Sequence, residues 1–354
     1  MRWTGQLGTG CTGLASSEPG APDWPARNRA RRTGQRRLIF TRADRGVGCG
    51  PSPSTIVAAM ANHDGNGWTR CDLGHRHWGL YGAAGLLACA PDRTGRDLVL
   101  LQRRNWWGNY GGTWGPPGGA RDSHEGAVAA ALREAAEECD VPAGAVSVRG
   151  ILRDDHGGWS YQTVIGAAPA PFEARSASSE TSEVAWVAAA DAGRLALHPG
   201  FAGQWPTLRA ALPPVTIIVD VANVMGSRPD GWWRDRAGAA ARLAGELAAL
   251  AGRGMPALPE SMRAPVLERW FPGYVLVLEG AARQVARDDR GAAAAASDRV
   301  RLVAAQGAGD DAIADLAKQV AGRRLVVTAD RELRERCVAA GASVAGPGWL
   351  MRQL

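Results

Sequence analysis

The chain has 354 residues, of which 45% are hydrophobic and 21% charged, and this is enough sequence for two ordinary domains with their own cores. Its formal net charge of +6 comes from residues 1–59, so the rest of the chain is neutral and has no general basic surface for nucleic acid. The sequence has no run of about 18 apolar residues for a membrane span, and its six scattered cysteines favour a reducing cytoplasm over a secreted disulfide scaffold.

Residues 1–65 predict a disordered, arginine-rich tail or a misassigned start. They contain RNRARRTGQRR and PSPS but no periodic apolar face. Met60 stands directly before the first segment with a globular pattern. We therefore expect the first folded domain to begin at residue 66.

Residues 66–212 have the pattern of a mixed α and β domain. Short apolar segments predict strands at 81–90, 97–103, 146–152, 160–167 and 183–188. An alanine-rich segment predicts the principal helix at 123–139, with Ser123 as its N-cap, and a second helix is expected at 203–212. Between the second strand and the principal helix, RNWWGNYGGTWGPPGG predicts an irregular loop.

The principal helix ends in a cluster of acids. Glu134, Glu137 and Glu138 are spaced i, i+3 and i+4, so they share one face of the helix. They lie at the C-terminal end, where the helix dipole disfavours negative charge. Three like charges repel unless a cation neutralises them, and Mg²⁺ or a similar hard cation binds oxygen ligands. The sequence therefore predicts a metal site, with a solvated acidic face as the alternative.

The spacing of these residues closely resembles the Nudix box. Gly119 is followed after five residues by Glu125, and after seven more by the segment REAAEE at 133–138. Two positions depart from the family pattern: Asp140 replaces a glycine, and Ala135 replaces a bulky aliphatic residue. Neither is a ligand position, and aspartate can adopt the left-handed conformation at a helix C-terminus.

The resemblance covers about residues 70–200 and implies a Nudix α/β/α sandwich. It implies hydrolysis of a nucleoside diphosphate linked to another moiety, with Mg²⁺ or Mn²⁺ as cofactor and water as nucleophile. The residues that it implies for the metal site are Gly119, Glu134, Glu137 and Glu138, with Arg133 orienting an acid and Glu125 mainly structural. The general base varies within the family, and the candidates here are Glu137, Glu180 and Glu183.

Substrate recognition has weaker candidates. Arg103 and Arg104 can meet phosphate or can end a strand, while Trp107 and Trp114 can stack on a base or can anchor the core.

Residues 71–77 contain three side chains of the types that bind zinc. Cys71, His75 and His77 are residue types that bind zinc, but the sequence offers no fourth ligand beside them. We therefore expect no zinc.

Residues 213–354 change to a different pattern. Short, continuous runs rich in valine, isoleucine and leucine alternate with helical stretches, which predicts a doubly wound parallel sheet. The expected strands are 215–220, 274–279, 300–305 and 324–329, and the expected helices are 236–250, 311–320 and 331–340. We expect a second domain with an α/β architecture, separate from the mixed first domain.

Acids stand at the ends of these predicted strands. In a parallel sheet the ligand crevice lies at the carboxyl ends of the strands, where separated acids can hold divalent cations. The segments VDVANVMGS, GDDAI and VVTADREL resemble the NYN branch of the PIN-like nucleases. This resemblance implies metal ligands at Asp220, Asp310, Asp311 and Asp330 and a substrate contact at Asn223. N-capping is the alternative for Asp310 and Asp330, whereas it explains Asp220 less well.

Together these patterns predict a metal-dependent, cytoplasmic pyrophosphohydrolase fused to a PIN-like NYN domain. A nucleotide diphosphate is the expected partner, RNA is a further candidate for the second domain, and no membrane partner is expected. The alternative function is a nucleotide sensor, in which the first domain binds a ligand and regulates the second. The sequence leaves open whether the chain forms a homodimer.

Overall fold

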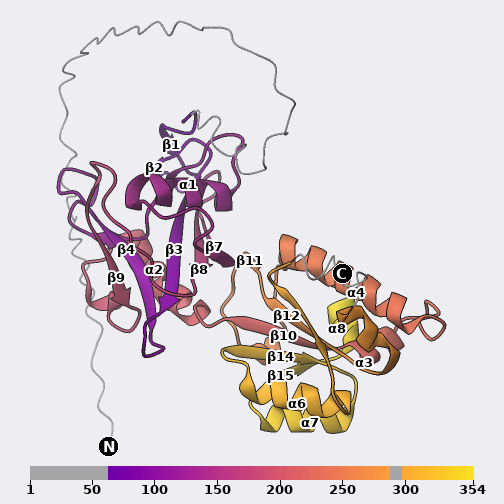
Figure 1. Ribbon diagram of the computed structural model, residues 1–354. Helices are drawn as coiled ribbons and strands as arrows, with labels where there is room; N and C mark the ends of the chain where they lie inside the picture. Colours follow the sequence, from indigo (N-terminus) through magenta and orange to yellow (C-terminus); the bar gives the residue numbers. More distant parts are fainter. Residues whose placement is uncertain (1–62, 288–296) are drawn as a thin grey trace, which may run out of the picture. The chain divides into compact units, whose positions relative to one another are not determined.

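The computed structural model describes residues 63–287 and 297–354, and the predicted tail up to residue 62 lies outside them (Figure 1). Residues 63–65 are held against the folded chain, because the backbone N–H groups of His63 and Gly65 donate to the carboxylate of Asp122, each at 3.0 Å. None of the helices in these described ranges is long and apolar enough to cross a membrane.

The first large sheet is mixed and has eight strands. Its strand order is β11-β7-β8-β3-β4-β5, and β6 and β9 pair with β3 and β4. Strand β3 runs parallel to β8, whereas β3–β4, β4–β9 and β7–β8 are antiparallel. The strands are β3 (Ala83–Pro91), β4 (Asp97–Arg104), β5 (Trp114–Gly115), β6 (Gly118–Ala120), β7 (Ser147–Asp155), β8 (Ser160–Ala167), β9 (Thr181–Ala188) and β11 (Arg269–Trp270). A separate hairpin pairs β1 (Trp68–Arg70) with β2 (Arg76–Trp78).

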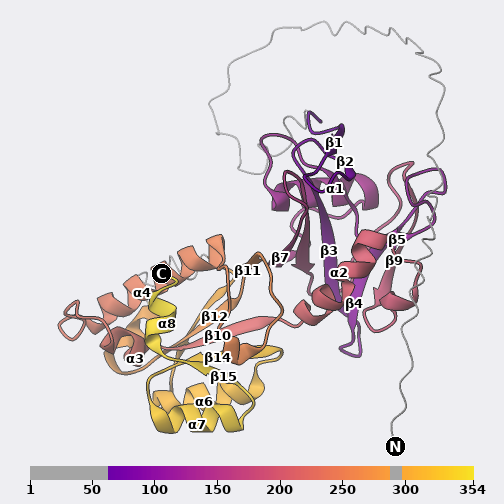
Figure 2. The same cartoon turned by 180° about the vertical axis from the view of Figure 1, so that it is seen from behind.

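One helix covers each face of this sheet. In β3, Leu86 packs in the core cluster of α1 (Ala127–Cys139), while its neighbour Leu87 packs in the cluster of α2 (Pro199–Ala211). Successive side chains of a strand point to opposite faces, so an apolar strand with this alternation needs cover on both sides. Helix α1 lies in front of the sheet in Figure 1 and α2 in front of it in Figure 2. A short turn, η2 (Ala192–Arg194), precedes α2.

The principal helix starts later than the sequence pattern predicts. It begins at Ala127, and its N-cap is Gly126 rather than Ser123. The side chain of Ser123 instead donates to Asp64 at 2.6 Å, and its backbone N–H donates to the same carboxylate at 2.9 Å. A contact with a residue 59 positions away thus replaces the predicted cap.

The predicted irregular loop before α1 also contains regular structure. Its last part forms β5 and β6, which pair with β4 and β3. Glycine permits this close pairing, since a Cβ at Gly118 would lie 2.5 Å from the carbonyl oxygen of Ala84. The predicted strand at 160–167 is confirmed. The helix expected at 203–212 begins four residues earlier, and Pro199 lies in its first turn.

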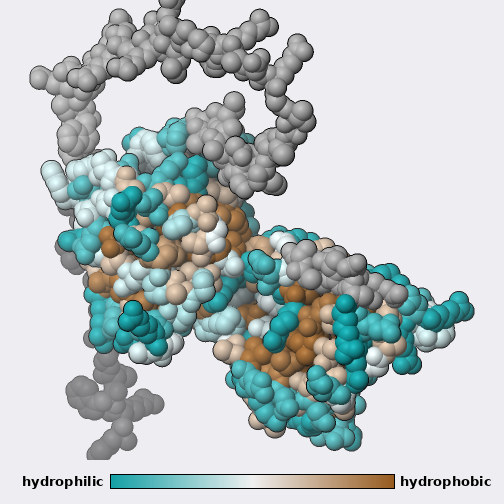
Figure 3. Space-filling view, in the orientation of Figure 1, coloured by the Kyte–Doolittle hydropathy of each residue, from teal (hydrophilic) through white to brown (hydrophobic). Residues whose placement is uncertain are grey.

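The second sheet is entirely parallel, with the order β13-β12-β10-β14-β15. Its strands are β10 (Val215–Asp220), β12 (Gly273–Leu278), β13 (Val300–Ala304), β14 (Arg323–Val327) and β15 (Ser343–Ala345). The helices and turns around it are α3 (Val221–Gly226), α4 (Arg236–Arg253), η3 (Glu260–Met262), η4 (Gly280–Ala286), α6 (Gly309–Gln319), α7 (Arg331–Ala339) and α8 (Pro347–Met351). Hydrophilic residues gather over α6 and α7 on the face seen in Figure 3. The arrangement of strands and helices is the predicted α/β pattern.

Candidate active site

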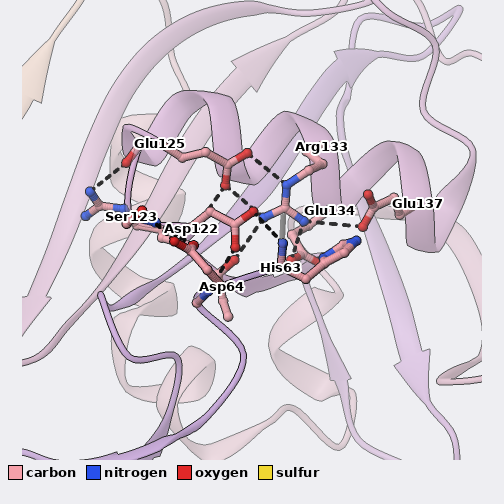
Figure 4. Close-up of polar contacts among 11 residues, drawn as sticks. His63, Asp64, Asp122, Ser123, Glu125, Arg133, Glu134 and Glu137 are labelled. Atoms are coloured by element: carbon pink, nitrogen blue, oxygen red, sulfur yellow. Dashed lines mark hydrogen bonds and ion pairs between the residues drawn. The ribbon is translucent and has the colours of Figure 1, made fainter. Parts of the chain in front are cut away.

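Arg133 is the centre of the polar network at the acidic helix (Figure 4). Its Nε and Nη2 atoms donate to the two carboxylate oxygens of Glu125 at 2.8 and 2.9 Å, and Nη2 also donates to the carbonyl of Ala120 at 2.9 Å. The remaining Nη1 atom contacts Glu134 at 2.8 Å and Glu137 at 3.3 Å. These contacts keep the guanidinium charged, and the Glu125 hydrogen bonds lower the pKa of that carboxyl group. One arginine therefore orients three carboxylates.

Glu138 lies on the buried side of the same helix and is 7% exposed. Its Oε2 atom accepts hydrogen bonds from Nε2 of Gln102 at 2.6 Å and from the backbone N–H of Gly118 at 2.8 Å. Burial raises the pKa of Glu138 to about 7, because the two hydrogen bonds and the nearby Arg104 only partly offset the loss of water. Within residues 63–287 and 297–354, Glu138 has no ion-pair partner, and a cation would stabilise such a nearly buried carboxylate.

The carboxylate of Glu134 lies against Gly119, the residue of β6 that follows Gly118. A Cβ added at Gly119 would lie 2.7 Å from the carboxylate atoms of Glu134, so the glycine leaves room for them. The pKa of Glu134 is raised by burial and by the nearby Glu137 and Glu125, and the contacts with Arg133 oppose this increase. Glu137 itself is the outermost of the three, with 45% of its side chain exposed.

This set of groups fits a hard divalent cation. Glu134 and Glu138 are shielded from water and lie beside the backbone of Gly118 and Gly119. Carboxylate and carbonyl oxygens are donors that suit Mg²⁺ and Mn²⁺. Among the described residues, the three carboxylates do not meet within 4.8 Å of one another. Their hydrogen bonds explain the separation, since Glu138 is held by Gln102 and Glu134 by Arg133.

The other candidates around the first sheet are divided between its two faces. Gln102 points toward α1, so the next side chain, Arg103, points to the opposite face together with its cross-strand partner Glu183. Their side chains approach to 3.9 Å. Glu183 is therefore not brought to the glutamates of α1. Arg104 is on the side of Glu138, whose pKa it lowers.

Glu180 and Trp107 lie in loops, whereas Trp114 lies in β5. Glu180 is exposed and accepts from the backbone of Asn105 at 2.7 Å through its carbonyl, which ties its loop to the end of β4. Trp107 is 53% exposed. Trp114 instead packs against the core on the α2 side of the sheet, which is the anchoring role given as its alternative.

Two residues of this site were missed from the sequence. Gln102 is the one polar residue among the buried residues of β4, and it contacts both Glu138 and the Sγ atom of Cys139. Tyr161 comes from β8, and a Cβ at Gly118 would lie 2.8 Å from its hydroxyl oxygen. Burial and the nearby Glu138 raise the pKa of Tyr161, so it stays a neutral phenol. The signal available in the sequence was the uncharged polar glutamine directly after the apolar run LVLL of DLVLLQRR.

At the second sheet, Asp220 is an N-cap, contrary to the expectation from its position after a strand. Its Oδ1 atom accepts from the backbone of Asn223 at 3.0 Å, and its Oδ2 atom accepts from the side chains of Asn223 and Thr328, each at 2.8 Å. Asp330 caps α7 by accepting from Leu333 at 2.7 Å. Both carboxylates thus have structural roles in the described chain.

The remaining acids at this edge point in two directions. Burial raises the pKa of Asp310, and nearby Asp220, Asp330 and Glu279 raise it further. Asp311 instead forms an ion pair with Arg336 on α7 at 2.7 Å. Asp310 therefore belongs to an acidic group at the carboxyl ends of the strands, while Asp311 faces its basic partner.

Comparisons with known proteins find a family model and relatives that match part of this chain. A sequence model described as the NUDIX domain matches residues 82–210. A Mycobacterium tuberculosis protein named "Putative 8-oxo-dGTP diphosphatase 3" is 42% identical over 175 residues, which cover 47% of this chain and 78% of the relative. A "Nucleoside triphosphate pyrophosphatase/Nudix hydrolase fusion protein" of Bifidobacterium longum is 37% identical over 153 residues, covering 42% of this chain and 32% of the relative.

A solved structure of similar sequence is the Nudix hydrolase RenU of M. smegmatis. It has 43% sequence identity and a TM-score of 0.40, and the match covers 41% of this chain and 93% of that protein.

Proposed function

This chain belongs to the Nudix family, and from that premise we propose that its site at α1 hydrolyses the diphosphate bond of a nucleotide substrate. As a Nudix hydrolase it is an enzyme. The observation that carries the proposal is the convergence of Glu134 and Glu138 on the adjacent glycines of β6. Water attacks one phosphorus, the bridging oxygen leaves with the other phosphate, and each product ends in a phosphate group.

The residues proposed to hold the divalent cation are Glu134, Glu137, Glu138 and the carbonyl of Gly119. When bound, Mg²⁺ or Mn²⁺ neutralises the diphosphate charge and polarises the phosphoryl oxygen. The protein's own contribution is positioning: Gln102 and Gly118 fix Glu138, and Arg133 fixes Glu134.

Glu137 is our choice for the general base. Nearly half of its side chain is exposed, so water can reach it, and its contact with Arg133 is the longest of that guanidinium's three carboxylate contacts. Glu183 lies on the opposite face of the sheet with Arg103, and Glu180 stands in the exposed loop beside Asn105. The position of Glu183 on the opposite face makes it a weaker candidate than Glu137.

The names of the relatives favour a nucleoside triphosphate as the first substrate to test. One relative is named for 8-oxo-dGTP and another for nucleoside triphosphates. In such a substrate, hydrolysis between the α- and β-phosphates would give a nucleoside monophosphate and pyrophosphate. Exposed Trp107 and half-buried Arg104 are the proposed contacts for base and phosphate.

The experiment is product chromatography on the full chain with Mg²⁺ or Mn²⁺. The panel contains 8-oxo-dGTP, unmodified nucleoside triphosphates, ADP-ribose, dinucleoside polyphosphates and 5′-triphosphate RNA. Glu138→Gln should reduce turnover about a hundredfold or more, because removing a metal ligand removes several kcal/mol of charge stabilisation. Exposed Glu173 provides the matched control, Glu173→Gln, which should keep wild-type rates.

Turnover that survives in Glu138→Gln would overturn the proposed site. A ligand that binds tightly and is never turned over by the wild-type chain would instead support the nucleotide sensor.

A second activity, ribonuclease cleavage by a PIN-like NYN domain, is proposed for residues 213–354. Its support is the acidic group at the carboxyl ends of a parallel sheet, where burial and the neighbouring Asp220 and Asp330 raise the pKa of Asp310. We expect Asp310→Asn to abolish cleavage of a labelled single-stranded RNA in Mg²⁺ or Mn²⁺, with Asp315→Asn on the exposed side of α6 as the control. Asp310 is the better test than Asp220, whose loss also removes a helix cap.

A further inference from the structure

Four zinc-type side chains come together outside the acidic site. Cys71, His75 and His77 belong to the β1–β2 hairpin, and His156 follows β7 in the turn before β8. One candidate ligand atom from each of the four lies within 4.8 Å of all the others. The fourth ligand, which is missing near residue 71 in the sequence, is therefore supplied by a residue distant along the chain.

The hairpin turn places two of these residues by its backbone. The N–H of Cys71 donates to the carbonyl of His75 at 3.0 Å, and the N–H of Gly74 donates to the carbonyl of Cys71 at 2.9 Å. Gly74 has a φ of +81°, a conformation that glycine adopts without strain. The Cys71 and His75 side chains are thus carried on one tight turn.

The second turn is docked onto the first. The N–H of Asp72 donates to the carbonyl of Gly157 at 2.9 Å. Gly157 has a φ of +68°, and a Cβ there would lie 2.6 Å from a carboxylate oxygen of Asp72. The sequence of the turn therefore permits the close approach that brings His156 to the hairpin.

Two ring nitrogens in the cluster lack hydrogen-bond partners. Nε2 of His77 and Nδ1 of His156 are buried, and neither atom forms a hydrogen bond with any residue of the described ranges. Buried polar atoms nearly always have a hydrogen-bond partner, so two buried nitrogens without one in the same cluster indicate a ligand site. The other nitrogen of His156, Nε2, lies 3.4 Å from a carboxylate oxygen of Asp154. A carboxylate behind a histidine is the usual partner of a metal-bound imidazole.

The residues around the cluster fix the orientation of the His77 ring, but the apolar core beside it is small. His77 stacks on Trp159, with ring centroids 3.9 Å apart and planes inclined by 9°. The buried apolar cluster here consists of Cys71, Ala83 and Trp159, with Tyr161 packed against it. A two-stranded hairpin is marginally stable by itself, so this hairpin needs a further source of stability.

We propose that Cys71, His75, His77 and His156 bind a structural Zn²⁺ ion that fastens the β1–β2 hairpin to the β7–β8 turn. One thiolate and three imidazoles suit zinc, and four protein ligands close a tetrahedral site. Bonds of about 2.0–2.3 Å place neighbouring ligand atoms about 3.5 Å apart, so small side-chain rotations from the present spacing complete the geometry. This site differs in chemistry from the carboxylate site at α1, which suits Mg²⁺ or Mn²⁺.

The test is the metal content of the full chain, purified without a histidine tag, loaded with Zn²⁺ and desalted in the presence of Mg²⁺. We expect about one tightly held zinc per chain. Cobalt loading should give the strong visible absorption of a tetrahedral site and a thiolate-to-metal charge-transfer band. Cys71→Ala should remove that band and the bound zinc, whereas Cys89→Ala, at another buried cysteine, should keep both.

The histidine variants separate a metal site from a folding defect. His75 is exposed, so His75→Ala should leave the fold intact and increase zinc loss to a chelator at least tenfold, while His124→Ala should not. Glu138→Gln should retain the zinc. Wild-type protein that holds no zinc, or His75→Ala that holds it as tightly as wild type, would overturn the proposal; neither outcome depends on the hydrolase activity.

Discussion

Glu125 and Arg133, eight residues apart, form a two-pronged ion pair in which each carboxylate oxygen accepts from a different guanidinium nitrogen. Both side chains are largely buried, with 9% and 14% of their areas exposed. Because Glu125 precedes α1 and Arg133 lies in its middle, the pair anchors the start of the helix to the arginine that orients Glu134. The ion pair thus gives Glu125 a structural role at the start of α1.

Replacing this arginine should therefore damage both stability and catalysis. Arg133→Lys cannot reproduce the two-pronged contact and leaves Glu125 and Glu134 incompletely paired. We expect the variant to lose about 3 kcal/mol of unfolding free energy, measured by urea denaturation, and most of its turnover. In a double-mutant cycle, Glu125→Gln should lessen the additional loss caused by Arg133→Lys. Additive effects of the two changes would contradict the coupling.

Gly119→Ala should separate catalysis from folding. The new Cβ would lie 2.7 Å from the Glu134 carboxylate, which is the movable end of a side chain, so the carboxylate can shift at little cost in stability. The shift misplaces a proposed metal ligand, and we expect at least a tenfold fall in kcat/KM with a nearly unchanged melting temperature. The control is Gly126→Ala, where no atom lies within 4 Å of the added Cβ. Equal activities of the two variants would count against the role of Gly119.

The pKa of Glu138 predicts an unusual dependence of stability on pH in chelator. Its value is raised from 4.5 to about 7 by burial. Between these values the folded protein binds a proton that the unfolded chain has released, so this contribution to stability is full below pH 4.5 and is lost as the pH rises toward about 7. Thermal melts from about pH 5 to about pH 7.5 should show a decline that Glu138→Gln reduces. Saturating Mn²⁺ should oppose the decline, since the metal prefers the ionised carboxylate.

Asp140→Gly should be tolerated and slightly stabilising. Asp140 has a φ of +55° at the C-cap of α1, which confirms that aspartate can adopt the left-handed conformation in place of the family's glycine. Glycine adopts it more easily, whereas the lost pair with Arg175 is exposed and worth little. We expect a gain of up to about 0.5 kcal/mol in urea denaturation. Asp140→Ala should be less stable than wild type, and the opposite ranking would contradict this explanation.

The sequence was most informative where local periodicity and tertiary structure agree. The alanine-rich pattern predicted the helix that carries Glu134, Glu137 and Glu138, and the apolar runs predicted β8 and β10. The start of α1 was missed because the contact between Ser123 and Asp64 spans 59 residues. No local pattern contains such a contact.

Contacts between distant segments explain the other differences between the sequence predictions and the structure. His156 joins Cys71 only because one turn docks onto another. Asp220 was expected to act chiefly as a metal ligand, yet a short helix begins directly after its strand and uses it as a cap. Gln102 acquires its importance from Glu138, 36 residues later. In each case the residue type was visible in the sequence, but its partner depended on the tertiary fold.

The order of strands in the second sheet has a consequence for its biosynthesis. β10 is the first of these strands to leave the ribosome, but it lies in the middle of the sheet, and its partners β12 and β14 are synthesised later. Val215 pairs with Arg323, so the central strand lacks one neighbour until more than a hundred further residues have been translated. Such long-range parallel pairing is slow and leaves apolar edges exposed meanwhile. Chaperone dependence during synthesis is therefore expected to be concentrated in this half of the chain.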